Sequence, residues 1–220
     1  MRYAGDDPIV RPGLVAPALA AEHPGLWLAW TEVEAEPGPT PPELRDRLRS
    51  MADRMRGADA IAMRRRDVPH AYRVFFRHVG LDPDVVRTPV EAIALRRLQQ
   101  GGLRPQGLID DAITVAVLET GVGVWAFDAA RLVGALELRE AVESEPLGRG
   151  EEPPSLPAGR LVLADDAGPL AVLFEEPRSR AAPSKRSRRL VVAAVAVPGV
   201  PDVSVHEALW TAADIVAETP

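Results

Sequence analysis

Helix-forming and strand-forming patterns occupy different halves of this chain, and that separation constrains the fold more than any other feature. Amphipathic helical patterns run between residues 40 and 120, whereas strand patterns run between residues 122 and 197. One strand (26–31) precedes the helices, and one helix that begins at Ser204 follows the strands. Segregated elements favour an α+β fold, with a mixed β-sheet flanked by helices, over a doubly wound parallel sheet.

Local signals at the helix ends support this division. A capping box at Thr40 opens the first helix, which we expect to end at Gly57, and Asp67 is expected to cap a second helix over 68–79. Another capping box, at Thr88, opens the third helix. The pattern over 108–120 is apolar almost all round and predicts a central, buried fourth helix.

Composition limits the protein to an ordinary globular class. The chain has 220 residues, 46% of them hydrophobic, and no cysteine, which excludes disulfides, thiolate zinc sites and cysteine nucleophiles. No linker divides it, so we expect one domain over 1–220. The longest apolar run, 190–200, is too short to span a bilayer, and no signal-peptide pattern is present, so a cytoplasmic protein without a membrane partner is expected.

Familiar catalytic and metal-binding motifs are absent from the sequence. His70 and His78 are eight positions apart, which on a helix separates them by about 12 Å, too far for one metal ion. No metal and no cofactor are therefore expected. The net charge of -6 also counts against a dedicated nucleic-acid binder, although charge distribution matters more than the total.

Three groups of residues have both a structural and a functional interpretation. Asp110 and Asp111 open the buried helix, where carboxylates interact well with the helix dipole and where ligands are also held. Trp125 and Phe127 share one face of a strand, as core residues or as a stacking wall. A basic loop is either solvated or an arm that contacts phosphates, and its cations are Arg178, Arg180, Lys185, Arg186, Arg188 and Arg189.

The order of several short segments is more specific than any of these groups. They are LRRL at 95–98, GLRP at 102–105, IDDA at 109–112, LETG at 118–121, AFD at 126–128 and LVLAD at 161–165. Together they resemble the B3/B4 domain, the tRNA-editing module of the phenylalanyl-tRNA synthetase beta subunit. The resemblance covers about 71–197 and leaves 1–66 as an N-terminal strand and helix extension.

The resemblance implies a site and a chemistry. In the synthetase, that module hydrolyses the ester of tyrosine wrongly attached to tRNA. Thr114 aligns with an Asn of the family, Trp125 with its His, and approximately Ala193 with its Glu. Its glycine pair after the hairpin is replaced by 175–177. The implied ligand pocket comprises Asp111, Thr114, Trp125, Phe127 and Asp128.

The resemblance therefore implies a stand-alone protein that binds tRNA or aminoacyl-tRNA. If the protein is an enzyme, the resemblance implies that it hydrolyses mischarged tRNA in trans. ATP-dependent aminoacylation is not expected. The alternative is a non-catalytic module for a small amino-acid-like or nucleoside-like ligand, and a third possibility is a structural or protein-binding domain. A polar pocket beside the basic loop would favour the first, a closed apolar pocket walled by Trp125 and Phe127 the second, and no pocket the third.

Overall fold

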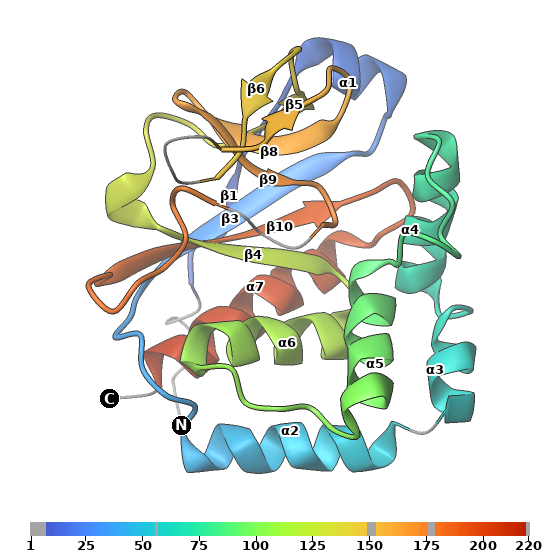
Figure 1. Ribbon diagram of the computed structural model, residues 1–220, viewed down its shortest axis with the longest axis vertical. Coiled ribbons are helices and arrows are strands. Elements are labelled where there is room, and N and C mark those ends of the chain that lie inside the picture. Colours follow the sequence, from blue (N-terminus) through green and yellow to red (C-terminus); the bar gives the residue numbers. More distant parts are fainter. Residues whose placement is uncertain (1–7, 56, 149–152, 176–178, 219–220) are drawn as a thin grey trace.

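Two four-stranded sheets form the centre of the molecule (Figure 1). The computed structural model describes residues 8–55, 57–148, 153–175 and 179–218. The first sheet is antiparallel, with the order β1 (Arg11–Pro12), β3 (Trp27–Glu34), β10 (Arg189–Ala196) and β4 (Gly123–Asp128). The second is mixed, with the order β2 (Leu14–Val15), β5 (Glu137–Glu140), β8 (Leu161–Asp165) and β9 (Gly168–Val172). A short pair, β6 (Glu145–Pro146) and β7 (Ser155–Leu156), lies beside it.

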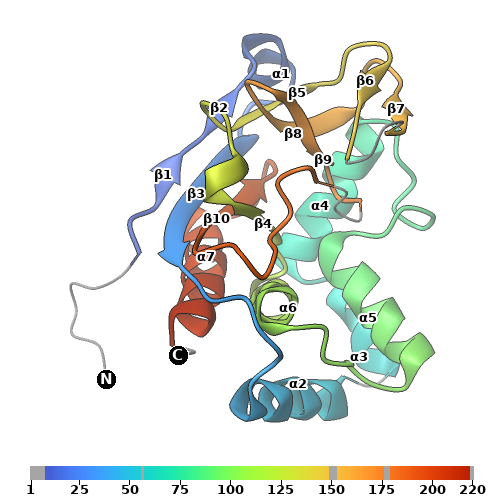
Figure 2. The same cartoon turned by 60° about the vertical axis from the view of Figure 1, so that its left-hand side comes forward.

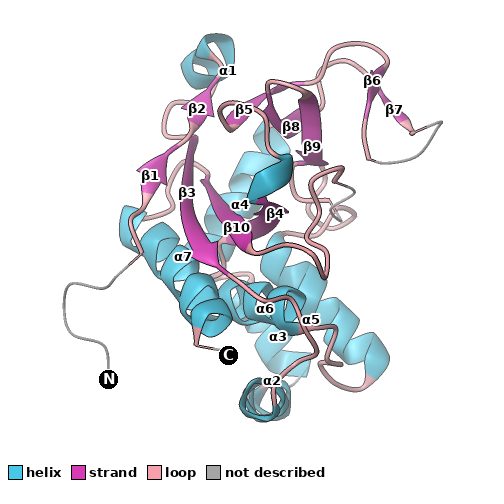
Figure 3. Ribbon diagram, turned by 90° about the vertical axis from the view of Figure 1, so that its left-hand side faces the viewer, coloured by secondary structure: helices cyan, strands magenta, loops and turns pink. Residues whose placement is uncertain are grey.

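Most helices lie on one side of the first sheet, whereas α1 (Pro17–Glu22) lies beside β5 of the second sheet (Figure 1). The others are α2 (Pro42–Arg54), α3 (Gly57–Met63), α4 (Asp67–His78), α5 (Pro89–Gln100), α6 (Leu108–Thr120) and α7 (Asp202–Ala217), with a 3-10 turn η1 (Ala129–Arg131) after β4. Helices α6 and α7 pack against each other below the first sheet, and the second sheet lies above it (Figure 3). The predicted α+β fold with a mixed sheet and flanking helices is confirmed.

Strand β10 is the most deeply buried element, as its apolar sequence predicts. Its residues from Leu190 to Ala196 are all buried, and it pairs with β3 on one side and β4 on the other. The N-terminal strand β3 is therefore an interior strand of the first sheet, between β1 and β10. The chain crosses from the first sheet to the second at Gly13, between β1 and β2. A Cβ at this position would lie 2.4 Å from a Leu28 side-chain carbon, so the crossing requires glycine.

Two predicted helix ends are confirmed: the start of α5 at Thr88 and the end of α6 at Gly121. Thr88 and Glu91 form a capping box at the start of α5. Gly121 ends α6 in a left-handed conformation, with φ of +80°, which glycine adopts without strain.

Other predicted ends were wrong because a neighbouring residue takes the capping position. Pro41 precedes α2, and the Thr40 side chain binds Asp111 instead of capping the helix. Asp67 is the first residue of α4, after Arg66, rather than its cap. Helix α7 begins at Asp202, two residues before Ser204.

Two short helices were not predicted. Gly57 begins α3 instead of ending the helix before it. Helix α1 follows the extended residues of β2, and the proline at its first position was the available signal.

Candidate functional site

A cleft with a volume of about 1500 Å³ opens between α5, α6, the outer side of β4 and the segment that follows β9. Figure 2 shows α6 end-on, with α5 beside it and the described part of the β9–β10 segment above it. Thr114 and Trp125, two of the five residues predicted for the ligand pocket, line this cleft. Helix α6 and strand β4 are joined by a tight turn at Gly121, which is why these two residues face the same space.

One wall of the cleft is aromatic. The Trp125 and Phe174 rings have centroids 6.0 Å apart, and Phe174 also contacts Tyr72, Phe75 and Phe76 behind it. Phe174 has a φ of +66°, a left-handed conformation that costs a bulky residue about 1 kcal/mol or more. Packing against the aromatic cluster holds it there. Phe174, two residues after β9, could not be singled out from the sequence.

The first turn of α6 supplies polar groups. Asp110 and Thr114 are four positions apart on this helix and both line the cleft. Partial burial raises the pKa of the Asp110 carboxyl, the nearby Asp111 raises it further, and Arg96 on α5 acts in the opposite direction. The Asp110 carboxyl therefore has a pKa above that of an ordinary aspartate.

Asp111 does not line the cleft, and its contacts are internal. Its side chain is 1% exposed and accepts hydrogen bonds from Thr40 Oγ1 at 2.5 Å and from the backbone N–H of Gln106 at 3.1 Å. The N–H of Gly107 approaches the same carboxylate at 3.4 Å. These contacts fix the entry to α6 and the loop before α2 relative to each other.

Phe127 and Asp128 also lie away from the cleft lining among the described residues. Phe127 is fully buried in the core. Asp128 accepts hydrogen bonds from Ser187 Oγ at 2.7 Å and from the N–H of Ala130 at 3.1 Å, and its own N–H donates to the carbonyl of Ala181 at 2.7 Å. Asp128 thus attaches the basic loop to the end of β4.

The tip of the basic loop is a compact turn. The N–H of Ser187 donates to the Ser184 carbonyl at 2.9 Å, and the N–H of Ser184 donates to Ser187 Oγ at 3.0 Å. Lys185 and Arg186 occupy the two central positions, are exposed, and have no ion-pair partner among the residues that the structure describes. Lys185 also lines the cleft. These two cations are free to bind an anion.

Three other predicted cations of this loop make contacts within the protein. Arg180 pairs with Asp165 and donates to the carbonyl of Arg131, while Arg188 donates to the carbonyls of Lys185 and Ser187. Arg189 lies 3.6 Å from Glu32. Arg178 lies outside the described residues. The structure thus brings Lys185 to the cleft and gives Arg180 and Arg188 structural contacts.

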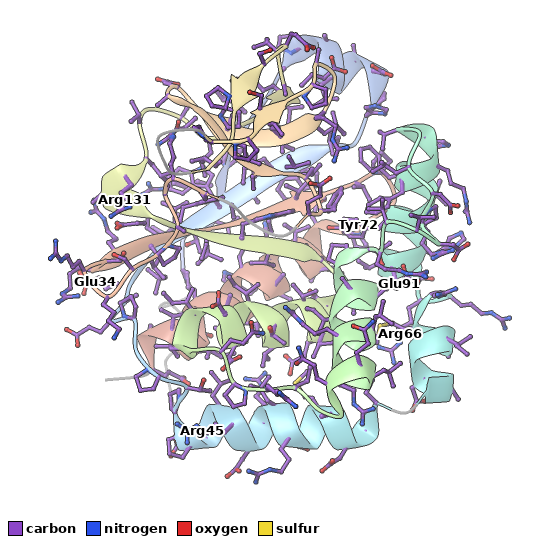
Figure 4. The ribbon with its side chains drawn as sticks, viewed as in Figure 1. Glu34, Arg45, Arg66, Tyr72, Glu91 and Arg131 are labelled. Carbon is purple, nitrogen blue, oxygen red and sulfur yellow. The ribbon has the colours of Figure 1, made fainter. Side chains whose placement is uncertain are left out.

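Further cations that were not predicted also line the cleft. They are Arg45, at the start of α2 (labelled in Figure 4), Arg87, which precedes α5 and lies 3.5 Å from Asp84, and Arg96 on α5. On α5 the lining residues Ala92, Arg96 and Gln99 follow the spacing of one helix face. This helical spacing could have indicated a binding face, but polar residues on a solvent-exposed helix face have the same spacing.

Two positions at which the sequence departs from the B3/B4 pattern are neighbours in the first sheet. Ala193 on β10 pairs directly with Trp125 on β4, so both side chains lie on the same face. Ala193 is fully buried. The pair therefore offers a bulky indole beside a methyl group in place of two polar side chains, and neither can move a proton.

Comparison with known proteins supports the predicted resemblance. Residues 71–175 match the family model of the B3/4 domain. Phenylalanine–tRNA ligase beta subunits are 36% identical over 94 residues in Streptomyces avermitilis and 39% identical over 85 residues in Chromobacterium violaceum. That of Neisseria meningitidis serogroup A is 30% identical over 123 residues.

These relatives are much longer than this chain. The matches cover 42%, 38% and 56% of this chain but 11%, 11% and 14% of the three relatives. Among solved structures, an N-terminal fragment of the phenylalanyl-tRNA synthetase beta subunit from Pyrococcus horikoshii aligns with 94% of this chain and 52% of its own, at 14% identity and a TM-score of 0.43.

Within the described ranges, no three His, Cys, Asp or Glu side chains gather closely enough to hold a metal ion. In the same part of the chain, every helix is too short or too polar to cross a membrane.

Proposed function

We propose that this protein binds tRNA or aminoacyl-tRNA, with the 3′ end of the RNA in the cleft and nearby phosphates on the turn 184–187. The observation that carries the proposal is the position of Lys185, which is both at the tip of the basic loop and on the rim of the cleft. Arg45, Arg87 and Arg96 extend positive charge around the same opening. An acidic protein can bind RNA when its cations gather at one site.

Binding to total cellular tRNA at low and moderate salt tests this proposal. Each phosphate contact contributes to a linear fall of log K with log salt, so the double variant Lys185→Ala/Arg186→Ala should bind more weakly and reduce the slope by roughly 1–2. The matched control is Arg49→Ala/Arg77→Ala, which removes the same charge from residues that do not line the cleft. Equal binding by both variants would contradict the role of the turn.

Hydrolysis of mischarged tRNA in trans is the enzymatic form of the same proposal. Ester hydrolysis needs a group that takes a proton from water. Among the described residues, the carboxylates that line the cleft are Asp110 and Glu175, and Glu175 is paired with Arg160. Asp110→Asn should therefore abolish deacylation while tRNA still binds, measured as release of the amino acid from charged tRNA. Unchanged deacylation by this variant would exclude Asp110 as the base.

The aromatic wall favours a second candidate, a small aromatic ligand bound without RNA. Trp125 and Phe174 could stack on an aromatic amino acid or a nucleoside. Tryptophan fluorescence would report such a ligand, and Trp125→Phe would identify the responding residue. Saturable binding of tyrosine or adenosine, together with no binding of tRNA at low salt, would favour this candidate over the first.

A further inference from the structure

The outer edge of β4 is a feature of the cleft that the binding of phosphates does not use. Within the described part of the chain, β4 is the last strand of the first sheet and pairs with β10 alone. The N–H of Asp128 donates to the carbonyl of Ala181, so it points away from β10. Backbone groups alternate in direction along an antiparallel strand, and the groups of Ala126 and Val124 therefore also point outward.

The opposite end of the strand agrees with this assignment. Gly123 pairs with Val195 on β10, and the hydroxyl of Tyr72 lies between them. Tyr72 accepts a hydrogen bond from the N–H of Gly123 at 3.0 Å and donates one to the carbonyl of Val195 at 2.5 Å. Gly123 therefore faces β10, and its neighbour Val124 faces the outer side.

The outward groups of Val124 and Ala126 open into the cleft. Both residues line it, and Val124 is only 7% exposed. Among the residues that the structure describes, neither has a hydrogen-bond partner on the outer side. Backbone N–H and C=O groups in such surroundings are nearly always paired, so this edge is ready to pair with a ligand.

The end of the edge shows that its outward backbone groups can be reached by another chain segment. The carbonyl of Ala181, which lies in a turn, accepts the outward N–H of Asp128. Further along this line of backbone groups, Ala126 and Val124 line the cleft together with Trp125 and Phe174. An extended peptide that lies along this line would form main-chain hydrogen bonds with the sheet, which is a common mode of peptide recognition.

We propose that the acyl group held in this cleft is a peptidyl group, whose extended backbone pairs with Val124 and Ala126. This deepens the proposed function and rests on it. Residues two apart on a strand are about 7 Å apart. A single aminoacyl group has one amine and one carbonyl and reaches one of the two residues, whereas a peptidyl chain reaches both. The cleft, at about 1500 Å³, also exceeds the roughly 300–1000 Å³ typical of drug-sized ligands.

Acyl-chain length provides the first test. The probes are 3′-amino-3′-deoxyadenosine derivatives that carry one, two or three alanines through a stable amide and end in an acetyl group. Two additional hydrogen bonds should make the three-alanine probe bind about tenfold or more tightly than the one-alanine probe. Equal affinities would overturn the peptidyl assignment, as would a free acetylated trialanine amide that binds as tightly as the adenosine-linked probe.

The position of the hydrogen bonds provides the second test. Successive amides of an extended chain point to opposite sides. N-methylation of the amide that faces β4 should therefore cancel the gain from chain length, while N-methylation of the next amide should leave it. If both methylated probes bind alike, pairing with the strand is excluded.

A protein variant completes the experiment. Ala126→Pro removes one outward N–H and no hydrogen bond to β10, and proline is tolerated on edge strands. Its affinity should no longer depend on chain length, and thermal unfolding would show whether it folds. If it does not fold, the methylated probes still decide. Binding of uncharged tRNA with no effect of chain length would refute only this inference, whereas no binding of tRNA or of any adenosine probe would refute the proposed function as well.

Discussion

Thr40 and Asp111 lie 71 positions apart in the sequence, and Thr40 Oγ1 donates a hydrogen bond of 2.5 Å to Asp111 Oδ2. The N–H of Gly107 donates to Thr40 Oγ1 in turn, at 3.1 Å. This small buried network joins the loop before α2 to the first turn of α6, and both segments line the cleft. The shape of the cleft therefore depends on a carboxylate that is outside its lining.

The substitution Asp111→Asn should lower the free energy of unfolding by about 2 kcal/mol, because an amide cannot accept hydrogen bonds at both of its heavy atoms and leaves a buried donor unpaired. Denaturant unfolding would measure this. Asp46→Asn on the exposed face of α2 is the matched control and should change stability by less than about 0.5 kcal/mol. Similar losses in the two variants would contradict the structural role of Asp111.

The buried Tyr72 makes a prediction for alkaline pH (Figure 4). Burial raises the pKa of its hydroxyl above the ordinary value of 10.0. The folded state keeps this proton when the unfolded state loses it, so stability should fall as pH rises above 10. Tyr72→Phe should lack that part of the fall, although it should be less stable at neutral pH by about 1–3 kcal/mol. Parallel pH profiles for the two proteins would contradict the assignment.

A buried ion pair holds α4 to α5. Arg73 Nη1 lies 2.9 Å from Glu91 Oε1, and the side chains are 9% and 4% exposed. Glu91→Gln leaves the Arg73 charge buried with a weaker partner and should cost about 3 kcal/mol, measured by denaturant unfolding. Glu119→Gln, which breaks the half-exposed pair with Arg47, should cost less than about 1 kcal/mol. A larger loss of unfolding free energy in Glu119→Gln than in Glu91→Gln would contradict this prediction.

Acidic pH should weaken the attachment of β6. Hydrogen bonds from Arg139 hold the pKa of Glu145 below its ordinary value of 4.5. The resulting stabilisation is present above pH 4.5 and is lost as pH falls through the lowered folded-state pKa. The difference in stability between the protein and its Glu145→Gln variant should therefore shrink below pH 4.5. A difference that stays constant down to pH 2 would show that this carboxylate contributes nothing through its charge.

Much of the fold could be predicted from local patterns. Helix α6 matches its predicted bounds, because its apolar composition and the following Gly121 are both local signals. The predicted cap at Thr40 failed for a different reason. A threonine beside proline resembles a cap in sequence, but the hydroxyl of Thr40 is used by Asp111, which is brought near only by the tertiary structure.

The site could be predicted in part. Thr114 and Trp125 line the cleft, and the resemblance to the B3/B4 domain identified them. The sequence did not show that Lys185 lines the cleft while Arg180 is ion-paired, because this difference depends on distant residues such as Asp165. Phe174 and Arg96 enter the cleft through the packing of the β9–β10 segment and α5, which sequence spacing does not define.

The most direct test of the central claim is the affinity for tRNA with and without its 3′-terminal adenosine, at one low salt concentration. If the cleft holds the 3′ end, removal of that nucleotide should weaken binding about tenfold or more, since stacking on an aromatic wall contributes roughly 1–3 kcal/mol per base. Trp125→Ala should remove the difference. Equal affinity for the two RNAs would show that any tRNA bound by this protein lies outside the cleft.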